Sequence, residues 1–172
     1  MAYIMVDIES DGPIPGDYSM ISFGAVLVND SLNETFYGKL KPISDNFVPE
    51  ALAVSGHLRD EVLLFDDPLT VMKDFANWIK VVCKDRPIFI SDNNGFDWMF
   101  ICWYFHHFTG ENPFGFSSQN LGSLFKGIEK DTFKTFKHLR KTKHTHNPVD
   151  DAKGNAEALL VMKSEYGLKI KF

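Results

Sequence analysis

The sequence predicts an α/β domain in which helices flank a mixed sheet. Three observations support this prediction: strand-like apolar runs dominate the first 40 residues, helical spacing of apolar residues dominates the remainder, and one short strand interrupts the helical part. This order of elements is typical of a layered α/β architecture. With 172 residues and 44% hydrophobic content, the chain is expected to form a single domain over residues 1–172.

Three strands are expected at the start of the chain. Residues 3–8 form one apolar run and residues 19–28 a second, and the Pro, Gly and Asp residues of 13–17 provide a turn between them. A third strand over 35–40 follows a turn at 29–33. Because short turns connect antiparallel neighbours, these strands are expected to form an antiparallel meander.

Two helices and a strand are expected in the middle of the chain. Apolar residues over 68–84 recur at helical spacing, and Asp66 or Asp67 can cap that helix. A short strand over 87–90 leads into the segment 96–108, which is apolar nearly all round. Such a segment is expected to be a helix buried on most sides.

The last third of the chain is expected to contain a loop and two helices. Gly, Asn, Ser and Pro residues are frequent over 109–122, which predicts a loop, and a short helix follows near 121–128. Asn147 is a good cap residue, and Pro148 suits the first helical position. The final helix is therefore expected over 148–166.

Composition and charge restrict the function classes. The formal net charge of −5 argues against a protein that coats long nucleic acid with a broad basic surface, but not against an enzyme that acts at one chain end. Cys83 and Cys102 lack the spacing of a zinc site or a disulfide framework. The sequence shows neither a signal-peptide pattern nor a run near the roughly 18 apolar residues of a membrane span. A cytoplasmic protein without a membrane partner is expected.

Acidic residues lie at the end of one predicted strand and shortly after another. Asp7 and Glu9 lie two positions apart in the first strand, so both carboxylates project from one face. Asp97 lies in the first turn of the apolar helix, directly after a strand, and Asp92 is an alternative to it. Each feature alone has a simpler explanation, namely a solvated strand end for the pair and helix capping for Asp97.

A histidine and two acids lie at the start of the final helix. His146 precedes Asp151 by five positions. Asp150 stands three residues after Asn147, where it can complete a capping box, and this leaves Asp151 free for a different task. An exposed loop histidine is the simpler explanation of His146.

Together these residues predict a metal-dependent reaction at phosphorus. Asp7, Glu9, Asp97 and Asp151 provide the oxygen ligands that Mg²⁺ and Mn²⁺ prefer. Two such ions are a general device for in-line displacement at phosphorus. His146 can take the proton of the attacking water. Phosphodiester hydrolysis is therefore the predicted reaction class.

These motifs resemble those of a known enzyme family. The sequence DIE at 7–9, the sequence NGFD at 94–97, and His146 followed by Asp151 are similar, in this order, to the three exonuclease motifs of the DnaQ-like DEDDh 3′-to-5′ exonucleases. The likeness spans nearly the whole chain. Within the family, the length is most similar to small stand-alone bacterial enzymes of the oligoribonuclease, RNase T and RNase AS types. The resemblance implies a ribonuclease H-like mixed sheet flanked by helices.

The resemblance also implies roles and a substrate. Asp7, Glu9, Asp97 and Asp151 would bind two divalent metal ions, Mg²⁺ or Mn²⁺, and His146 would be the general base. The substrate would be the 3′ end of a single strand, released as nucleoside 5′-monophosphates, and the likeness to small ribonucleases favours RNA. A DNA-directed proofreading or repair exonuclease and a non-catalytic nucleic-acid-binding domain of the same fold are the alternatives.

Further residues are implied to contact the terminal nucleotide. They lie after the first motif, near the end of a short Ser-Gly-His segment and in the second motif: Ser10, Asp11, Gly12, His57 and Asn94. His57 departs from the common family pattern, because that pattern has histidine before glycine. Several small members of the family are homodimers, so a homodimer is also implied.

One basic stretch precedes the last motif. Residues 126–143 contain seven Lys or Arg residues against Glu129 and Asp131 only. The stretch is expected either to hold a few phosphates beside the site or to be a solvated surface segment.

Overall fold

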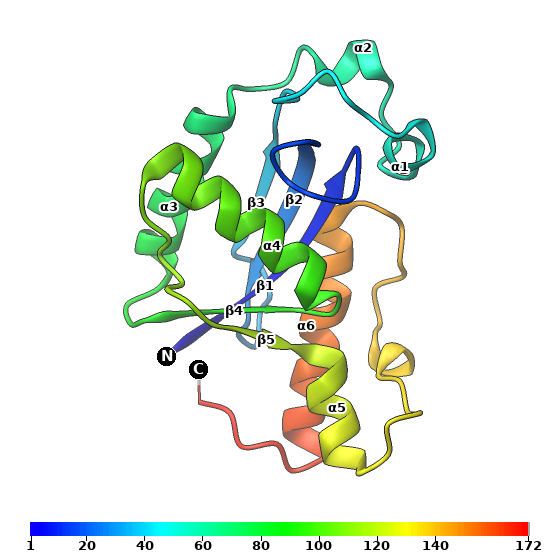
Figure 1. The fold of residues 1–172 in the computed structure, drawn as a ribbon. Helices are drawn as coiled ribbons and strands as arrows, with labels where there is room; N and C mark the ends of the chain where they lie inside the picture. Colours follow the sequence, from blue (N-terminus) through cyan, green and yellow to red (C-terminus); the bar gives the residue numbers. More distant parts are fainter. Residues whose placement is uncertain (172) are drawn as a thin grey trace.

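The computed structural model describes residues 1–171, which contain a five-stranded mixed sheet (Figure 1). The strands are β1 (Ala2–Ser10), β2 (Met20–Leu27), β3 (Thr35–Lys39), β4 (Pro87–Ser91) and β5 (Ser118–Asn120). Their order is β3-β2-β1-β4-β5. β1, β2 and β3 are antiparallel neighbours, whereas β4 runs parallel to β1 and β5 parallel to β4. The mixed sheet and the antiparallel meander are confirmed.

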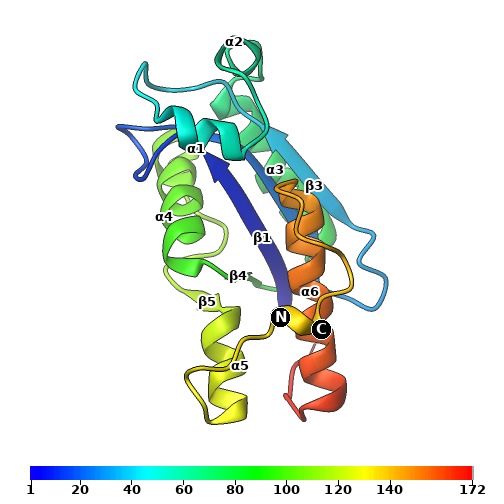
Figure 2. The ribbon, with the colours of Figure 1, turned by 90° about the vertical axis from the view of Figure 1, so that its right-hand side faces the viewer.

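Helices cover both faces of this sheet. α3 (Pro68–Val82) and α4 (Asn94–Tyr104) pack on one face, while α5 (Leu121–Glu129) and α6 (Pro148–Glu165) pack on the other. Two short helices, α1 (Pro49–Val54) and α2 (Arg59–Val62), lie beyond the end of β1, as Figures 1 and 2 show from two directions. Among residues 1–171, no helix combines the length and apolar character needed to cross a membrane.

The predicted helix starts are confirmed by their caps. α3 begins at Pro68, directly after Asp67. The Asp67 carboxylate accepts a hydrogen bond from the N–H of Thr70 at 3.3 Å. The Asn147 side chain accepts the N–H of Val149 at 3.0 Å before α6. In both helices, a polar side chain satisfies backbone donors that have no partner inside the helix.

Alternation along β1 determines which layer each side chain meets. Ile4, Val6 and Ile8 are buried against α3 and α4, whereas Met5 packs in the cluster formed with α5 and α6. Successive side chains of a strand point to opposite faces. Asp7 and Glu9 share the face of Met5, so they lie on the side of α6.

Parts of the chain differ from expectation. The loop expected over 109–122 contains β5, whose Ser-Gln-Asn sequence has no apolar alternation and which forms by pairing with β4. α1 and α2 are too short to show a helical period. The apolar helix expected over 96–108 begins at Asn94 and continues after Tyr104 as a π-helical turn, Phe105–Thr109.

Candidate active site

β1 positions the first two predicted carboxylates. Asp7 pairs with Gly24 of β2, and Glu9 pairs with Ser22. The register then shifts between Glu9 and Ser10. Such irregularities are frequent next to active sites, where they redirect side chains. Because β1 is the central strand, its neighbours hold the backbone that carries both carboxylates.

A glycine brings α6 directly against this strand pair. A Cβ atom on Gly24 would overlap with the backbone of Pro148 and Val149. The missing side chain therefore lets the first turn of α6 rest on β2, opposite Asp7. Asp151 belongs to that turn and is buried, so this contact places its carboxylate next to those of β1.

Asp97 reaches the cluster from α4. β4 pairs with β1 only as far as Met5 and Ile90, so the edge of β1 beyond Met5 is open to the first turn of α4. Asp97 is 2% exposed, and its Oδ2 atom is buried without a hydrogen-bond partner among residues 1–171. The capping explanation of Asp97 is not supported, because the N-cap position belongs to Asn93.

His146 lies at the solvent side of the cluster. Its Nδ1 atom is 3.8 Å from Oε1 of Glu9, and its side chain is 50% exposed. Its backbone N–H donates to Oδ2 of Asp151 at 3.0 Å. The φ angle of His146 is 60°, a left-handed conformation that is uncommon outside glycine. The structure thus brings all five predicted catalytic residues together.

Burial and mutual repulsion raise the pKa of three of these carboxyl groups. For Asp7, burial is the main cause of a pKa well above the usual range, and the charge of Asp97 adds to it. Burial and the charge of Asp151 raise the pKa of Glu9 to about 7. Burial, followed by the charges of Asp92 and Glu9, raises the pKa of Asp97. Negative charge is therefore concentrated where water cannot fully stabilise it.

The donor set fits a hard divalent cation. All four acids are carboxylates, which Mg²⁺ and Mn²⁺ prefer, and the buried Oδ2 of Asp97 is free to act as a ligand. Within residues 1–171, no three His, Cys, Asp or Glu side chains already have the spacing of a metal site. The fit to a divalent cation therefore rests on the chemistry of the four carboxylates and not on a preformed ligand spacing.

Two contacts of Asp151 were not predicted. Nη2 of Arg140 donates to Oδ1 of Asp151 at 2.8 Å, and Nδ1 of His144 lies 2.8 Å from the same oxygen. No motif marks Arg140, which is one of several cations in the basic stretch. Gly154, three residues after Asp151, makes room for this side chain, because a Cβ atom there would collide with the guanidinium group.

The expected capping box at α6 is half formed, because the Asn147 side chain accepts the N–H of Asp150 at 3.4 Å but the N–H of Asn147 has a different acceptor. The backbone N–H of Asn147 donates to Oγ1 of Thr145 at 3.3 Å, which takes the place of the Asp150 carboxylate. Oδ2 of Asp150 instead lies 3.4 Å from the same Thr145 hydroxyl. Asp151 remains the acid that faces the cluster.

The residues implied to contact the nucleotide after β1 have partners inside the protein. The Ser10 hydroxyl donates to the carbonyl of Gly12 at 2.8 Å. Asp11 is fully buried and accepts hydrogen bonds from the N–H of Ser19 and from Arg59. Burial raises the pKa of Asp11, and the hydrogen bond from Ser19 and the charge of Arg59 oppose this effect. In this structure these groups stabilise the turn after β1, and their contact with substrate stays a prediction.

The two other implied residues are also engaged. The Asn94 side chain donates to the carbonyl of Gln119 and accepts from the Ser118 hydroxyl, both at 2.9 Å, which joins α4 to β5. Nδ1 of His57 lies 2.9 Å from Oε1 of Glu61. Contact of Asn94 and His57 with substrate likewise stays a prediction.

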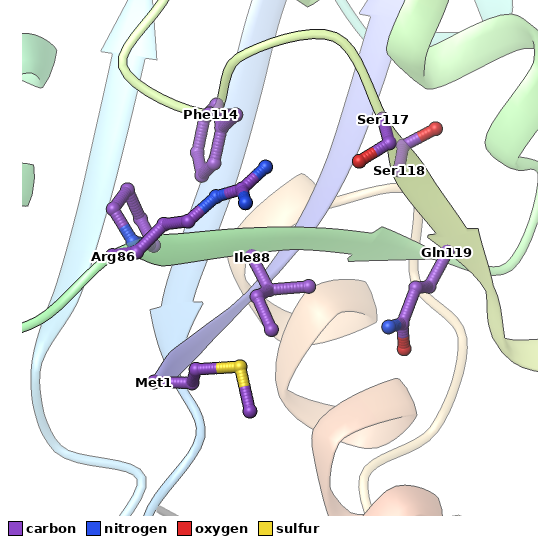
Figure 3. Close-up of a pocket in the computed structure, with 8 residues that line it drawn as sticks. Met1, Arg86, Ile88, Phe114, Ser117, Ser118 and Gln119 are labelled. Carbon is purple, nitrogen blue, oxygen red and sulfur yellow. The ribbon is translucent and has the colours of Figure 1, made fainter.

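The pocket in Figure 3 is separate from this cluster. It lies where β4 begins, whereas Asp7 and Glu9 lie beyond the last residue of β1 that pairs with β4. None of the five predicted catalytic residues lines it; its lining consists of Met1, Arg86, Pro87, Ile88, Phe114, Ser117, Ser118 and Gln119.

Sequence comparison identifies one clear relative. No protein-family profile matches the chain. The chain is 36% identical over 166 residues to the 3′-5′ DNA exonuclease Cap18 of Escherichia coli. The alignment covers 90% of this chain and 88% of that protein.

Solved nuclease structures share the fold. The nuclease domain of 3′hExo, a DEDDh family member bound to rAMP, superposes with a TM-score of 0.76 at 18% identity and covers 99% of this chain and 96% of its own. E. coli Exonuclease I in complex with a dA16 oligonucleotide gives a TM-score of 0.72 at 17% identity, over 95% of this chain and 41% of its own. The expected ribonuclease H-like fold is confirmed. Since the Cap18 match also covers 90% of the sequence, the chain belongs to the DnaQ-like DEDDh family of 3′-to-5′ exonucleases.

Proposed function

We propose that this protein is a metal-dependent exonuclease that shortens single-stranded nucleic acid from its 3′ end and releases nucleoside 5′-monophosphates. The observation that carries the proposal is the convergence of four carboxylates from β1, α4 and α6 on one place, with His146 beside Glu9. The activity named for the E. coli relative supports the direction of attack.

The four carboxylates would hold two divalent ions, Mg²⁺ or Mn²⁺. When bound, such ions supply the positive charge that activates a water molecule and stabilises the leaving 3′-oxygen. The protein holds the ligands in place through β1 for Asp7 and Glu9, through α4 for Asp97, and through α6 for Asp151. The buried, unpartnered Oδ2 of Asp97 and the raised pKa of Asp7 support this assignment.

His146 would accept the proton of the attacking water. Its half-exposed ring is open to solvent on one side and faces Glu9 on the other. The hydrogen bond from its backbone N–H to Asp151 holds the residue in its left-handed conformation at the start of α6. A general base has to be neutral before it can accept a proton, so this role belongs to the unprotonated imidazole.

The strand would approach along the segment between α5 and α6. This segment runs beside α6 up to the start of that helix (Figure 1), and the N–H groups of Lys141 and Thr142 bond to the Glu157 carboxylate at 2.8 and 2.7 Å. Lys126 in the last turn of α5 is exposed and suited to phosphate contacts. The lysines of the segment itself are exposed as well: Lys130, Lys134, Lys137, Lys141 and Lys143. Arg140 is not part of this surface, because it is turned inward to Asp151.

The sugar preference has two candidates. The expectation of RNA rests on the likeness to small stand-alone ribonucleases. The relative of 36% identity is named as a DNA exonuclease, and this observation favours the DNA-directed alternative. A group that contacts the terminal 2′-hydroxyl would distinguish the two.

Digestion of matched 5′-labelled and 3′-labelled RNA and DNA oligonucleotides tests the proposal. With Mg²⁺ or Mn²⁺, the 5′ label is expected in a ladder of shortening products, and the 3′ label in mononucleotide from the first turnover. Asp7→Asn is expected to be inactive, whereas Asp30→Asn, at an exposed turn, serves as the matched control. Wild-type protein that binds an oligonucleotide but never shortens it would favour the non-catalytic binding domain instead.

A further inference from the structure

Arg140 and Asp151 form an ion pair that is almost withdrawn from water. Nη2 and Oδ1 are 2.8 Å apart, and the two side chains are 8% and 1% exposed. In the part of the chain that the structure describes, Nε of Arg140 is buried without a hydrogen-bond partner. The cost of removing both charges from water offsets much of their attraction, so such a pair is a weak source of folding free energy. A role in orienting Asp151 accounts for the pair better than a role in stability.

α6 is adapted to this guanidinium group. A Cβ atom on Gly154 would lie 2.5 Å from Nε and 2.7 Å from Nη2 of Arg140, and 2.8 Å from the carbonyl oxygen of Thr142. Glycine inside a helix is less favourable than alanine. Because Gly154 has no side chain, the guanidinium group of Arg140 can fill the space beside it.

The donors around Asp151 are divided unequally between its two oxygens. Oδ1 meets Nη2 of Arg140, Nδ1 of His144 and, at 3.3 Å, the N–H of Thr145. Oδ2 receives one hydrogen bond, from the N–H of His146 at 3.0 Å. A carboxylate oxygen has about two lone-pair sites. Oδ1 is therefore fully used, whereas Oδ2 has capacity left.

We propose that Arg140 is a positioning residue that fixes the plane of the Asp151 carboxylate and so presents Oδ2 to a divalent metal ion. The inference rests on the proposed metal-dependent function. The guanidinium group engages Oδ1 and leaves Oδ2 the capacity for a further partner, while the backbone of α6 holds the rest of the residue. Lysine is not equivalent, because its ammonium group is a point charge on a flexible stem rather than a planar fork.

Manganese binding without substrate tests this inference. The probe is Mn²⁺ alone, and the measurement is the concentration of free Mn²⁺ by electron paramagnetic resonance, together with thermal unfolding in EDTA. Arg140→Met is expected to weaken Mn²⁺ binding about tenfold or more, the size of effect typical when a group that orients a metal ligand is lost. Gly154→Ala keeps every ionisable group but displaces the guanidinium group, so it is expected to weaken Mn²⁺ binding as well.

The controls separate positioning from charge and from folding. Arg86→Met, at the exposed arginine next to β4 in Figure 3, is expected to bind Mn²⁺ like the wild type. Arg140→Lys keeps the charge but loses the planar guanidinium group, so Mn²⁺ binding is expected to remain weakened. If Gly154→Ala does not fold, the comparison of Arg140→Met with Arg140→Lys still decides the question.

Each contrary result has a defined meaning. Unchanged Mn²⁺ affinity in Arg140→Met would show a purely structural role, tighter binding would show that arginine competes with the metal, and full recovery in Arg140→Lys would show that charge alone matters. Any of these overturns the inference. Wild-type protein that binds no Mn²⁺ overturns both this inference and the metal-dependent function. Wild-type protein that binds Mn²⁺ through an Arg140-dependent site but does not shorten oligonucleotides overturns the proposed function alone.

Discussion

Gly24 lies directly across the strand pair from Asp7, and the backbone of Pro148 packs where a side chain of Gly24 would be. This relationship joins the two halves of the candidate site, because β1 carries Asp7 and Glu9 while the start of α6 carries Asp151. A side chain at position 24 would move the first turn of α6 away from the sheet.

Replacement of Gly24 is therefore expected to reduce both stability and activity. In Gly24→Ala, the new Cβ atom meets backbone that cannot rotate away, and overpacking of this kind lowers the free energy of unfolding by about 1–3 kcal/mol. Urea unfolding measures the change. Gly127→Ala is the matched control, because no atom of the described residues 1–171 lies within 4 Å of its Cβ position, and it is expected to retain stability and activity. Wild-type stability in Gly24→Ala would contradict the close approach of α6.

Substitution of Asp151 and substitution of Asp150 are expected to have very different effects on hydrolysis. Asp151→Asn should abolish hydrolysis, because the substitution removes a ligand charge from the cluster. Within residues 1–171, the Asp150 carboxylate has one hydrogen bond, from the Thr145 hydroxyl at 3.4 Å, so Asp150→Asn should change the free energy of unfolding by less than about 0.5 kcal/mol and preserve activity. Single-turnover digestion of one labelled oligonucleotide compares the two variants, and the opposite ranking would show that the last motif is misaligned.

Loss of the imidazole of His146 is expected to reduce the rate without unfolding the protein. Asparagine tolerates the left-handed conformation at this position better than most residues, so His146→Asn preserves the backbone. The expected loss in the rate constant is about 10²- to 10⁴-fold, the usual contribution of a general base. Near-normal rates in a variant with unchanged melting temperature would remove His146 from the mechanism.

The metal-free protein is expected to lose stability as the pH rises. The pKa of Glu9 is raised from its usual 4.5 to about 7 by burial and by Asp151, so the folded state keeps a proton that the unfolded chain releases. Between these two values the folded state binds more protons, and the free energy of unfolding therefore falls with increasing pH. The pKa values of Asp7 and Asp97 are also raised in the folded state, so these residues likewise lower the free energy of unfolding as the pH increases.

Glu9→Gln tests this pH dependence. Glutamine cannot titrate, so melting temperatures in EDTA should decline less steeply between about pH 5 and pH 7 than those of the wild type. Equal slopes would show that Glu9 is not held in its protonated form.

The sequence was sufficient to predict the strands and helices that carry a long apolar pattern or a clear cap. Alternation identified β1 and the shared face of Asp7 and Glu9, and the Asn147-Pro148 start of α6 placed Asp151 on its first turn. β5 was missed because its three polar residues become a strand only by pairing with β4. The capping box is only half formed because the hydroxyl of Thr145, outside the motif, is the nearer acceptor.

The residues that support the candidate site from inside the protein are positioned by tertiary contacts, which the spacing of residues in the sequence does not reveal. Arg140 precedes Asp151 by eleven residues and belongs to a stretch rich in lysine, so the sequence does not distinguish an inward guanidinium group from a solvated one. The roles of Gly24 and Gly154 likewise become visible only when the chain that packs against each of them is in place.

The central claim is that Asp7, Glu9, Asp97 and Asp151 together bind the ions that carry out catalysis. Anomalous diffraction from crystals of the wild-type protein grown with Mn²⁺ and a nucleoside 5′-monophosphate tests it most directly. We predict two manganese peaks about 3.5–4 Å apart among these four carboxylates. Peaks elsewhere, or none in the cluster at saturating Mn²⁺, would contradict the account.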